Sequence, residues 1–415
     1  MVRRTRCAAG GYLGATIAPL SDLAGLQATM AGRPGVFIKN TRPEGSAKAA
    51  GLKTGDVLLS IDNAPVASPQ QLVSLIRNYR TGQRFVVTGL RKGKPFTRTV
   101  VVRSRPPETH AGFTTLYQSV VVHAAQRRLI VTRPSKPGKY PAILFMGGMG
   151  CYSLDKLTEG HPYGRILAEL TRAGFVTLRV EKIGMGDSEG TACMSNAADL
   201  QQEIDGYTAG LRALKRLSFV DSSQSFILGH IMGGVTAAMV ASKTKVKGVM
   251  VSGTIGTSFA EHELDNLRRQ LALRKVPDSQ IDSLVRLKAR CNARLYADRK
   301  SPEQVKQELP YCSQLPIQPA VPYTYLQQAF DLNLSKLWAQ VDAPVLVVHG
   351  TADFRATAAE NRYIVDVVNR SRPGHGTYVE VVEMEHGFGP APSPQASWDR
   401  EVSGAAGFIP SSSWK

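Results

Sequence analysis

The chain lacks several features that mark particular classes of protein. Its 415 residues contain only five cysteines, with no CxxC pair and no cysteine–histidine spacing suited to zinc, so no metal site is expected. It has no run of about 18 apolar residues, so a membrane-spanning helix is not expected. Met1 to Gly11 carry three arginines, but no apolar run of about seven residues follows, so they do not form a complete secretory signal. We expect a soluble protein, although a chain that had already lost its signal would look the same.

The cysteines leave the redox state open. Cys291 and Cys312 bracket 20 residues of a polar, helix-like stretch, which is compatible with a disulfide and equally with two reduced thiols. The remaining cysteines add no recognisable pair; they are Cys7, Cys151 and Cys193.

Acidic residues are scarce in the first part of the chain. Residues 1–110 hold 17 lysines and arginines against 5 acidic residues, and the rest holds 34 against 28, so most of the net charge of +18 lies near the N-terminus. Such charge can attract acidic peptides, anionic lipids or nucleic acids. No nucleic-acid motif and no basic cluster interleaved with aromatics accompanies it, so we expect no nucleic-acid partner. A solvated, solubilising face is the simpler interpretation.

The length and an apolar content of 43% predict two domains, and the first has a pattern of its own at residues 10–104. A glycine-bearing turn at Gly10 to Ala15 precedes an alternating strand at Gly35 to Lys39. The sequence SAKAAGLKTGDVLLSIDNAPV then fills Ser46 to Val66, and an amphipathic helix is predicted at Ser68 to Tyr79. This segment resembles a PDZ domain of the kind common in bacterial proteases.

The resemblance implies a peptide-binding groove. An extended peptide would add a strand to the open edge of the sheet, and N–H groups of a turn would hold its terminal carboxylate. By the resemblance, that turn is Tyr12, Leu13, Gly14 and Ala15. A spacer or gate that binds no free peptide is the alternative. The paired prolines in residues 105–114 end the domain and predict a linker.

From Tyr117 onward, apolar strands alternate with amphipathic helices. Such alternation predicts an α/β fold with a doubly wound, mostly parallel sheet, whose site lies at the carboxyl ends of the strands. The predicted strands are 120–123, 129–132, 142–146, 175–180, 225–228, 246–252, 345–349 and 378–383, and the predicted helices are 163–172, 198–214, 235–242 and 358–369.

One turn between a predicted strand and a predicted helix carries the strongest functional signal. Gly229 to Gly234 read GHIMGG, which matches the G-x-S-x-G turn of serine hydrolases except that Ile231 occupies the serine position. That position normally has a positive φ, which a β-branched residue adopts only at a cost of about 1–3 kcal/mol. Ile231 therefore lacks the nucleophilic oxygen and also fits the turn poorly. Serine and isoleucine codons can differ by one nucleotide, so a single change in an intact enzyme is one explanation.

Two further strand ends carry residues in the order that such hydrolases use. Asp353 and His386 follow successive predicted strands, and the acid and the histidine come after the nucleophile position in the chain. In this interpretation Asp353 holds the tautomer of His386, and His386 relays the proton. The glycine-rich loop after strand 142–146 predicts an oxyanion hole formed by the N–H groups of Met149 and Met232.

Together these motifs make residues 115–388 similar to an α/β-hydrolase of the serine esterase and aminopeptidase kind. The loop Glu181 to Gly190 resembles a glycine-rich loop of such enzymes, although Ile183 stands where a small polar residue is frequent. The resemblance implies that the helical insertion at 257–335 is a lid that selects substrates; a surface subdomain without a gating role is the alternative. No cofactor is implied.

The sequence leaves two functions open. The first is a serine-type hydrolase of ester or peptide bonds, working by an acyl-enzyme route, with substrate delivered or gated by the PDZ module and with turnover crippled by Ile231. The second is a non-catalytic scaffold that binds peptides or other ligands. A residual rate of about 10³–10⁴-fold over water can survive the loss of triad members, as it does in a serine protease. Acyl-enzyme formation cannot survive, because Ile231 has no nucleophilic oxygen.

The end of the chain shows no helical period. Residues 389–415 are rich in proline, glycine and serine and predict an irregular tail, either natural or produced by an altered reading frame. The resemblance to bacterial proteins favours a periplasmic or secreted location, and the sequence leaves the oligomeric state open.

Overall fold

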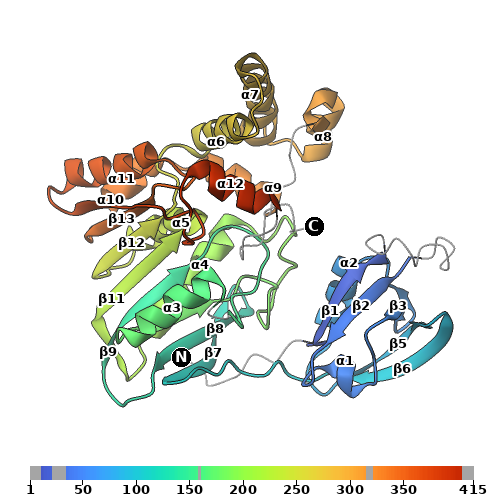
Figure 1. Cartoon of the computed structure of the whole chain (residues 1–415). Coiled ribbons are helices and arrows are strands. Elements are labelled where there is room, and N and C mark those ends of the chain that lie inside the picture. Colours follow the sequence, from blue (N-terminus) through green and yellow to red (C-terminus); the bar gives the residue numbers. More distant parts are fainter. Residues whose placement is uncertain (1–10, 21–33, 158–159, 315–320, 404–415) are drawn as a thin grey trace. The chain divides into compact units, whose positions relative to one another are not determined.

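The computed structural model of the protein describes residues 11–20, 34–157, 160–314 and 321–403. The chain forms two compact units, one that ends at Glu108 and one that begins at Thr109 (Figure 1). The arginine-rich start of the chain, Cys7 and residues 404–415 of the predicted tail lie outside the described residues. Among the residues described, no helix is both long and apolar enough to cross a bilayer.

The first unit is a small antiparallel sheet with two helices. Its strand order is β1-β2-β3-β5-β6, with the short β4 beside β3, so β1 lies at an edge. The long helix α2 begins after Ser68, whose side chain accepts a hydrogen bond from the N–H of Gln71 at 3.1 Å. The elements are β1 (Ala15–Pro19), β2 (Val36–Thr41), α1 (Ser46–Ala49), β3 (Asp56–Ile61), β4 (Ala64–Pro65), α2 (Pro69–Arg77), β5 (Arg84–Arg91) and β6 (Lys94–Val101).

The second unit is built on a sheet of eight strands in the order β14-β13-β12-β11-β9-β10-β8-β7. The strands from β14 to β10 are parallel, and β8 and β7 close the other edge in antiparallel fashion. The strands are β7 (Phe113–Val122), β8 (Ala125–Pro134), β9 (Tyr140–Met146), β10 (Val176–Val180), β11 (Val220–His230), β12 (Gly248–Ser252), β13 (Val345–Gly350) and β14 (Gly376–Val381). The predicted mostly parallel α/β-hydrolase sheet is therefore confirmed, and its opening hairpin is longer than predicted.

Side chains that alternate along the strands pack into two separate hydrophobic cores. Ile227 faces the core formed with α4 and α5, whereas its neighbour Leu228 faces the core formed with α3. Helices α10 and α11 contribute to the first core, and the sheet face beyond α3 carries an open apolar groove of about 500 Å³ lined by Phe226, Met250 and Leu346, among others. The helices are α3 (Pro162–Arg172), α4 (Leu200–Leu214), α5 (Met232–Ala241), α10 (Leu334–Gln340) and α11 (Ala358–Ser371).

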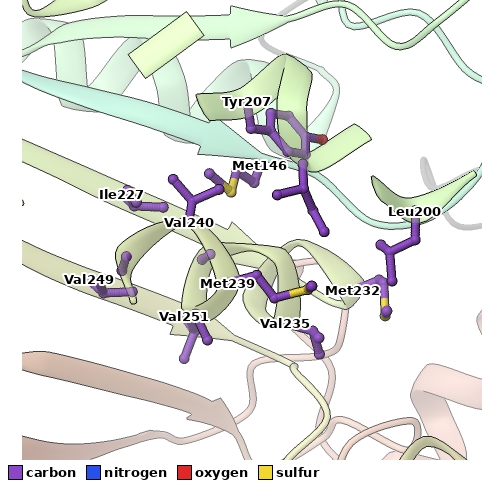
Figure 2. Packing of buried hydrophobic residues seen from close by; sticks show 14 of the residues in the cluster. Met146, Leu200, Tyr207, Ile227, Met232, Val235, Met239, Val240, Val249 and Val251 are labelled. Carbon is purple, nitrogen blue, oxygen red and sulfur yellow. The ribbon is translucent and has the colours of Figure 1, made fainter. Parts of the chain in front are cut away.

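Helix α5 is buried along its whole length. All ten of its residues are buried, as expected of a helix that is apolar on every side. Figure 2 shows Val235, Met239 and Val240 of this helix among the side chains of the neighbouring strands. The turn that begins α5 is therefore held by the centre of the core.

The insertion between β12 and β13 is helical, as predicted. A capping box at Ser258 starts its first helix, where the Ser258 and Glu261 side chains cap each other's backbone N–H groups. The disulfide Cys291–Cys312, one of the two states left open by the sequence, joins α7 to a following 3₁₀ turn. Its elements are α6 (Phe259–Leu273), α7 (Asp278–Asn292), a π-helical turn (Ala293–Ala297), α8 (Pro302–Glu308), a 3₁₀ turn (Pro310–Gln314) and α9 (Tyr323–Phe330).

The prediction of an irregular tail is wrong for residues 394–403, which form helix α12 (Pro394–Ser403). The Ser393 side chain accepts a hydrogen bond from the N–H of Ala396 at 3.2 Å, and Pro394 occupies the first helical position, where its missing N–H has no consequence. Trp398 is buried against the ring of Phe354. The prolines that suggested an irregular chain instead lie at the start of a helix, and Trp398 of this helix packs into the protein.

We predict that Trp398→Ala lowers the free energy of unfolding by about 3 kcal/mol, because it removes a buried aromatic side chain and leaves a cavity. Urea denaturation followed by circular dichroism measures the change. Val402→Ala is the matched control, since Val402 lies on the same helix with 65% of its side chain exposed and should change stability by no more than about 0.5 kcal/mol. Equal effects of the two substitutions would contradict the docking of α12.

Candidate active site

The turn between β11 and α5 holds Ile231 in a strained conformation. Ile231 has φ 57° and ψ −127°, and its N–H donates to the carbonyl of Ser252 at 3.2 Å. This region costs a β-branched residue about 1–3 kcal/mol. A side chain at Gly233 would lie 2.1 Å from the carbonyl oxygen of Met146, so the turn needs glycine there to pack against β9. The sequence therefore folds as a sharp strand-to-helix turn despite the isoleucine.

Hydrogen bonds to its backbone and packing of its side chain hold Ile231 in place. Its carbonyl accepts hydrogen bonds from the N–H of Gly234 at 3.0 Å and from the hydroxyl of Thr254 at 2.7 Å. Its half-buried side chain packs against the main core and against Gly148, where an added Cβ would lie 2.9 Å from Cδ1 of Ile231. The side chain thus occupies the space between the turn and the glycine-rich loop after β9.

The structure brings Asp353 and His386 together. Oδ2 of Asp353 lies 2.8 Å from Nδ1 of His386, and both residues are buried. Oδ1 of Asp353 accepts hydrogen bonds from the N–H groups of Arg355 at 2.7 Å and Ala356 at 3.0 Å. Burial raises the pKa of Asp353, but the neighbouring His386 and these hydrogen bonds outweigh it and lower the pKa to about 2. Asp353 is therefore a carboxylate at neutral pH.

The second ring nitrogen of His386, Nε2, can accept a proton. Within the described part of the chain, its Nε2 is buried and has no hydrogen-bond partner. The loop of Ser252, Gly253 and Thr254 joins this pair to the turn: a side chain at Gly253 would lie 3.1 Å from both Asp353 Oδ2 and His386 Nδ1, while Ser252 and Thr254 bond Ile231. An imidazole with Nδ1 bound to a carboxylate and Nε2 free is arranged to accept a proton.

The predicted oxyanion donors lie on the two elements that flank Ile231. Met232 is the first residue of α5, and the first N–H groups of a helix have no acceptor within the helix. Met149 follows Gly148 in the loop after β9, and its half-buried side chain packs on the main core together with Ile231. The positive end of the helix dipole also lies at this point.

Sequence reasoning missed the groups that hold the loop after β9. The carbonyl of Gly148 accepts hydrogen bonds from Nζ of Lys182 at 2.6 Å and from the hydroxyl of Tyr152 at 2.7 Å. Lys182 forms an ion pair with Glu203 at 3.1 Å, and both come from elements next to β9. The position of Lys182 two residues after a buried strand was the available signal, because a buried lysine must find a partner.

A second disulfide, Cys151–Cys193, was not predicted. It joins the loop after β9 to the loop after β10, across a sequence separation of 42 residues. Only the sheet order, which puts β9 beside β10, brings these cysteines together.

Helix α12 and the insertion both support the acid and the histidine. Ser397 and Arg400 of α12 bond the carboxylate of Glu385, the residue before His386, and Glu401 pairs with Arg355. From α6, Arg269 donates hydrogen bonds to the carbonyls of Phe354 and Arg355 at 3.2 and 2.6 Å. The site is therefore braced by two segments whose role the sequence did not show.

In the first unit, the predicted carboxylate turn lies at the open edge of the sheet. Gly14 has φ 66°, and an added Cβ would lie 2.5 Å from Cα of Gly45. The carbonyls of Leu13 and Gly14 accept hydrogen bonds from the N–H groups of Ala47 and Arg42 at 2.8 and 2.7 Å. Tyr12 pairs with Arg103, and Ala15 starts the edge strand β1 next to α2. Across the described segments of both units, no group of three metal-binding side chains occurs.

We predict that Asp353 makes stability depend on pH in acid. Its pKa falls from 3.8 to about 2 on folding, so its contribution is present above pH 3.8 and is lost as the pH falls toward 2, at up to about 1.4 kcal/mol per pH unit. Urea denaturation between pH 4.5 and 2.5 gives the free energy of unfolding at each pH. Its slope against pH should be smaller for Asp353→Asn than for the unchanged protein. Asp265→Asn, at an exposed aspartate of α6, should keep the slope. Identical slopes for all three proteins would contradict the assignment.

The comparisons with known proteins match the two units separately. The PDZ domain matches residues 11–102, and the family described as serine aminopeptidase, S33, matches residues 158–387. The magnetosome formation protease MamE of Magnetospirillum gryphiswaldense is 36% identical over 81 residues, which are 20% of this chain and 10% of MamE. A probable periplasmic serine endoprotease, DegP-like, of Brucella suis is 26% identical over 96 residues, or 23% of this chain and 19% of that protein. The chain thus spans a tenth to a fifth of these relatives.

Solved structures cover the larger part of the chain. The DcsB complex with its substrate analogue has a TM-score of 0.44 and 19% identity, covering 66% of this chain and 91% of that one. Est1E from Butyrivibrio proteoclasticus with ferulic acid has a TM-score of 0.43 and 14% identity, at 65% and 91% coverage. A Pyrococcus furiosus esterase has a TM-score of 0.44 and 13% identity, at 73% and 94% coverage.

The match to the hydrolase family extends from α3 to the residue after His386 and includes the turn at Ile231 and Asp353. It spans more than half of the chain. The protein therefore belongs to the serine aminopeptidase family S33, with a PDZ domain before the α/β-hydrolase fold.

Proposed function

We propose that this protein carries the site of a serine-type hydrolase for ester or peptide bonds, in which Ile231 has replaced the nucleophile and abolished acyl-enzyme formation. The observation that carries the proposal is the buried Asp353–His386 pair, with Nε2 of His386 unpartnered among the described residues, beside a strained turn that presents residue 231. A base without a proton donor, at a turn that normally supplies one, indicates a missing hydroxyl.

The geometry supports an acyl-transfer mechanism once a hydroxyl stands at residue 231. Nε2 of His386 would take the hydroxyl proton as the oxygen attacks a carbonyl carbon, and would return it to the leaving group. Asp353 would stabilise the imidazolium, since it remains ionised well below neutral pH. The N–H groups of Met149 and Met232 would bind the oxygen that becomes negative.

Ile231 removes more than the oxygen. Its side chain packs against Gly148, so it occupies part of the space that a tetrahedral intermediate needs between the turn and the loop after β9. A smaller residue would reopen this space. The distinction between the missing hydroxyl and the added bulk can therefore be tested at the same position.

We predict that Ile231→Ser restores labelling by a fluorophosphonate probe and raises the hydrolysis of an activated short-chain ester by about 10³-fold or more. Ile231→Ala is the matched control, because it removes the bulk and supplies no hydroxyl, and it should neither label nor accelerate hydrolysis. The double variant Ile231→Ser, His386→Ala should also lose labelling. A folded serine variant that neither labels nor turns over would overturn the proposal.

The PDZ domain is proposed to recruit or gate the substrate. The edge strand β1 and the turn before it provide backbone groups for an added peptide strand and its carboxylate. Two disulfides favour an oxidising compartment, as does the similarity of this domain to a protease named as periplasmic. We propose a periplasmic or secreted protein that meets peptide ends there.

A non-catalytic binder is the second candidate. The packing of Ile231 into the main core favours it, because the turn keeps its shape and the core its continuity without a nucleophile. In this form the PDZ domain and the hydrolase domain would bind ligands and release them unchanged.

We predict that a C-terminal peptide library yields a defined ligand for the PDZ domain and that Gly14→Ala weakens its binding by at least about tenfold. The added Cβ would lie 2.5 Å from Cα of Gly45 and force the carboxylate turn to move. Gly82→Ala is the control, since Gly82 also has a positive φ, 90°, but an added Cβ meets nothing within 4 Å. Fluorescence anisotropy measures both affinities. A library without a ligand, or equal losses for both variants, would leave the spacer interpretation.

A further inference from the structure

His230, the residue before Ile231, has contacts that play no part in the proposed acyl transfer. His230 is the last residue of β11 and is completely buried. Its Nδ1 lies 2.8 Å from the hydroxyl of Tyr163, and its Nε2 lies 2.8 Å from the carbonyl oxygen of His386. Its ring packs against the rings of Phe388 and His386, with centroids 4.4 and 5.1 Å away.

The directions of these hydrogen bonds follow from the chemistry of the groups. The carbonyl of His386 can only accept, so Nε2 of His230 must carry the proton and donate it. In a neutral imidazole Nδ1 then accepts, and the hydroxyl of Tyr163 must donate to it. Burial, and then the charge of His386, lowers the pKa of His230 to about 3, so the ring is neutral at physiological pH. The titratable groups that influence it are His386, Asp353 and Tyr163.

Tyr163 extends this connection to the loop after β9. Its hydroxyl oxygen accepts a longer hydrogen bond, 3.4 Å, from the N–H of Gly148, the residue that contacts Ile231. Tyr163 lies on α3 and is itself fixed by an edge-on contact with Phe145 of β9. A continuous chain of directed hydrogen bonds therefore runs from Gly148 through Tyr163 and His230 to the backbone of His386.

We propose that His230 is a positioning residue, whose neutral imidazole joins the oxyanion loop to the backbone of His386 and aims the base at residue 231. The aiming rests on the proposed function, whereas the connection itself is a property of the protein with Ile231. Asp353 holds the ring of His386 at Nδ1, and His230 holds the same residue at its carbonyl. Two anchors on opposite sides of the Cα restrict the ring more than either one alone.

The expected effect is large because proton transfer depends on position. A displacement of about 1 Å of a catalytic group can lower the rate about 100-fold without a change in the chemistry of that group. Loss of His230 would release the backbone of His386 and leave the hydroxyl of Tyr163 without its acceptor. Tyr163→Phe would remove the hydrogen bond from Gly148 and the one donated to Nδ1 of His230, and would leave the bond from His230 to the carbonyl of His386 in place.

The first experiment uses the protein with Ile231. Proton NMR should show a low-field resonance from the Nδ1–H of His386 bonded to Asp353, assigned by its absence in Asp353→Asn. His230→Leu should broaden or abolish this resonance through faster exchange, whereas His230→Gln, which carries one donor and one acceptor, should retain it. Tyr296→Phe, at a buried tyrosine that bonds Glu263 in the insertion, is the matched control and should leave it unchanged.

The second experiment measures turnover in the Ile231→Ser background. Adding His230→Leu should lower kcat for an activated ester about 100-fold with KM changed less than about threefold, because binding groups stay while the base is misaligned. His230→Gln should recover most of kcat. Tyr163→Phe should cost less than His230→Leu.

The outcomes separate this inference from the proposed function. If Ile231→Ser is inactive, the proposed function fails, and the NMR comparison still decides the role of His230. If folded His230→Leu keeps the resonance, or keeps kcat in an active serine background, His230 does not position His386 and the inference is wrong. If His230→Leu does not fold, the comparison of His230→Gln with Tyr163→Phe provides the test. A glutamine variant that is more impaired than the phenylalanine variant would overturn the inference.

Discussion

The close packing of the turn between β11 and α5 fixes the backbone of residue 231, and the loop from Ser252 to Thr254 links this turn to Asp353 and His386. Gly233 lies against the carbonyl of Met146, and α5 is buried throughout, so the turn cannot relax outward. Residue 231 is consequently held at positive φ whatever its side chain. An isoleucine is tolerated there because the buried core offsets a strain of about 1–3 kcal/mol. The turn thus keeps a sharp strand-to-helix form around an isoleucine, whose side chain has no nucleophilic atom.

The acid and base are held by elements that are far apart in the chain. Asp353 is fixed by backbone N–H groups that follow it, and His386 by Asp353 on one side and His230 on the other. Helix α12 and helix α6 then bond the residues next to both. This redundancy explains how the pair stays aligned around a position that cannot react. The placement of the pair comes from hydrogen bonds between segments that are distant in the chain.

The sequence indicated the fold and the members of the site because their signals are local. A buried strand, a glycine turn and an apolar helix are adjacent at Gly229 to Gly234, and Asp353 and His386 each follow an apolar strand. The PDZ pattern at Ser46 to Val66 is equally continuous. The helix at Pro394–Ser403 was missed because its large buried residue, Trp398, gives no period, and its prolines suggested an irregular chain.

Local sequence patterns were enough to predict the sheet, the strand ends that carry Asp353 and His386, and the absence of a nucleophilic side chain at residue 231. The folded arrangement was needed to find the distant groups that support them: Lys182 on Gly148, Cys151 with Cys193, and His230 on His386. The physical reason is that strand and helix periodicity depends on neighbours in the chain. Hydrogen bonds and disulfides between loops depend on the order of strands in the sheet, which sequence spacing does not express.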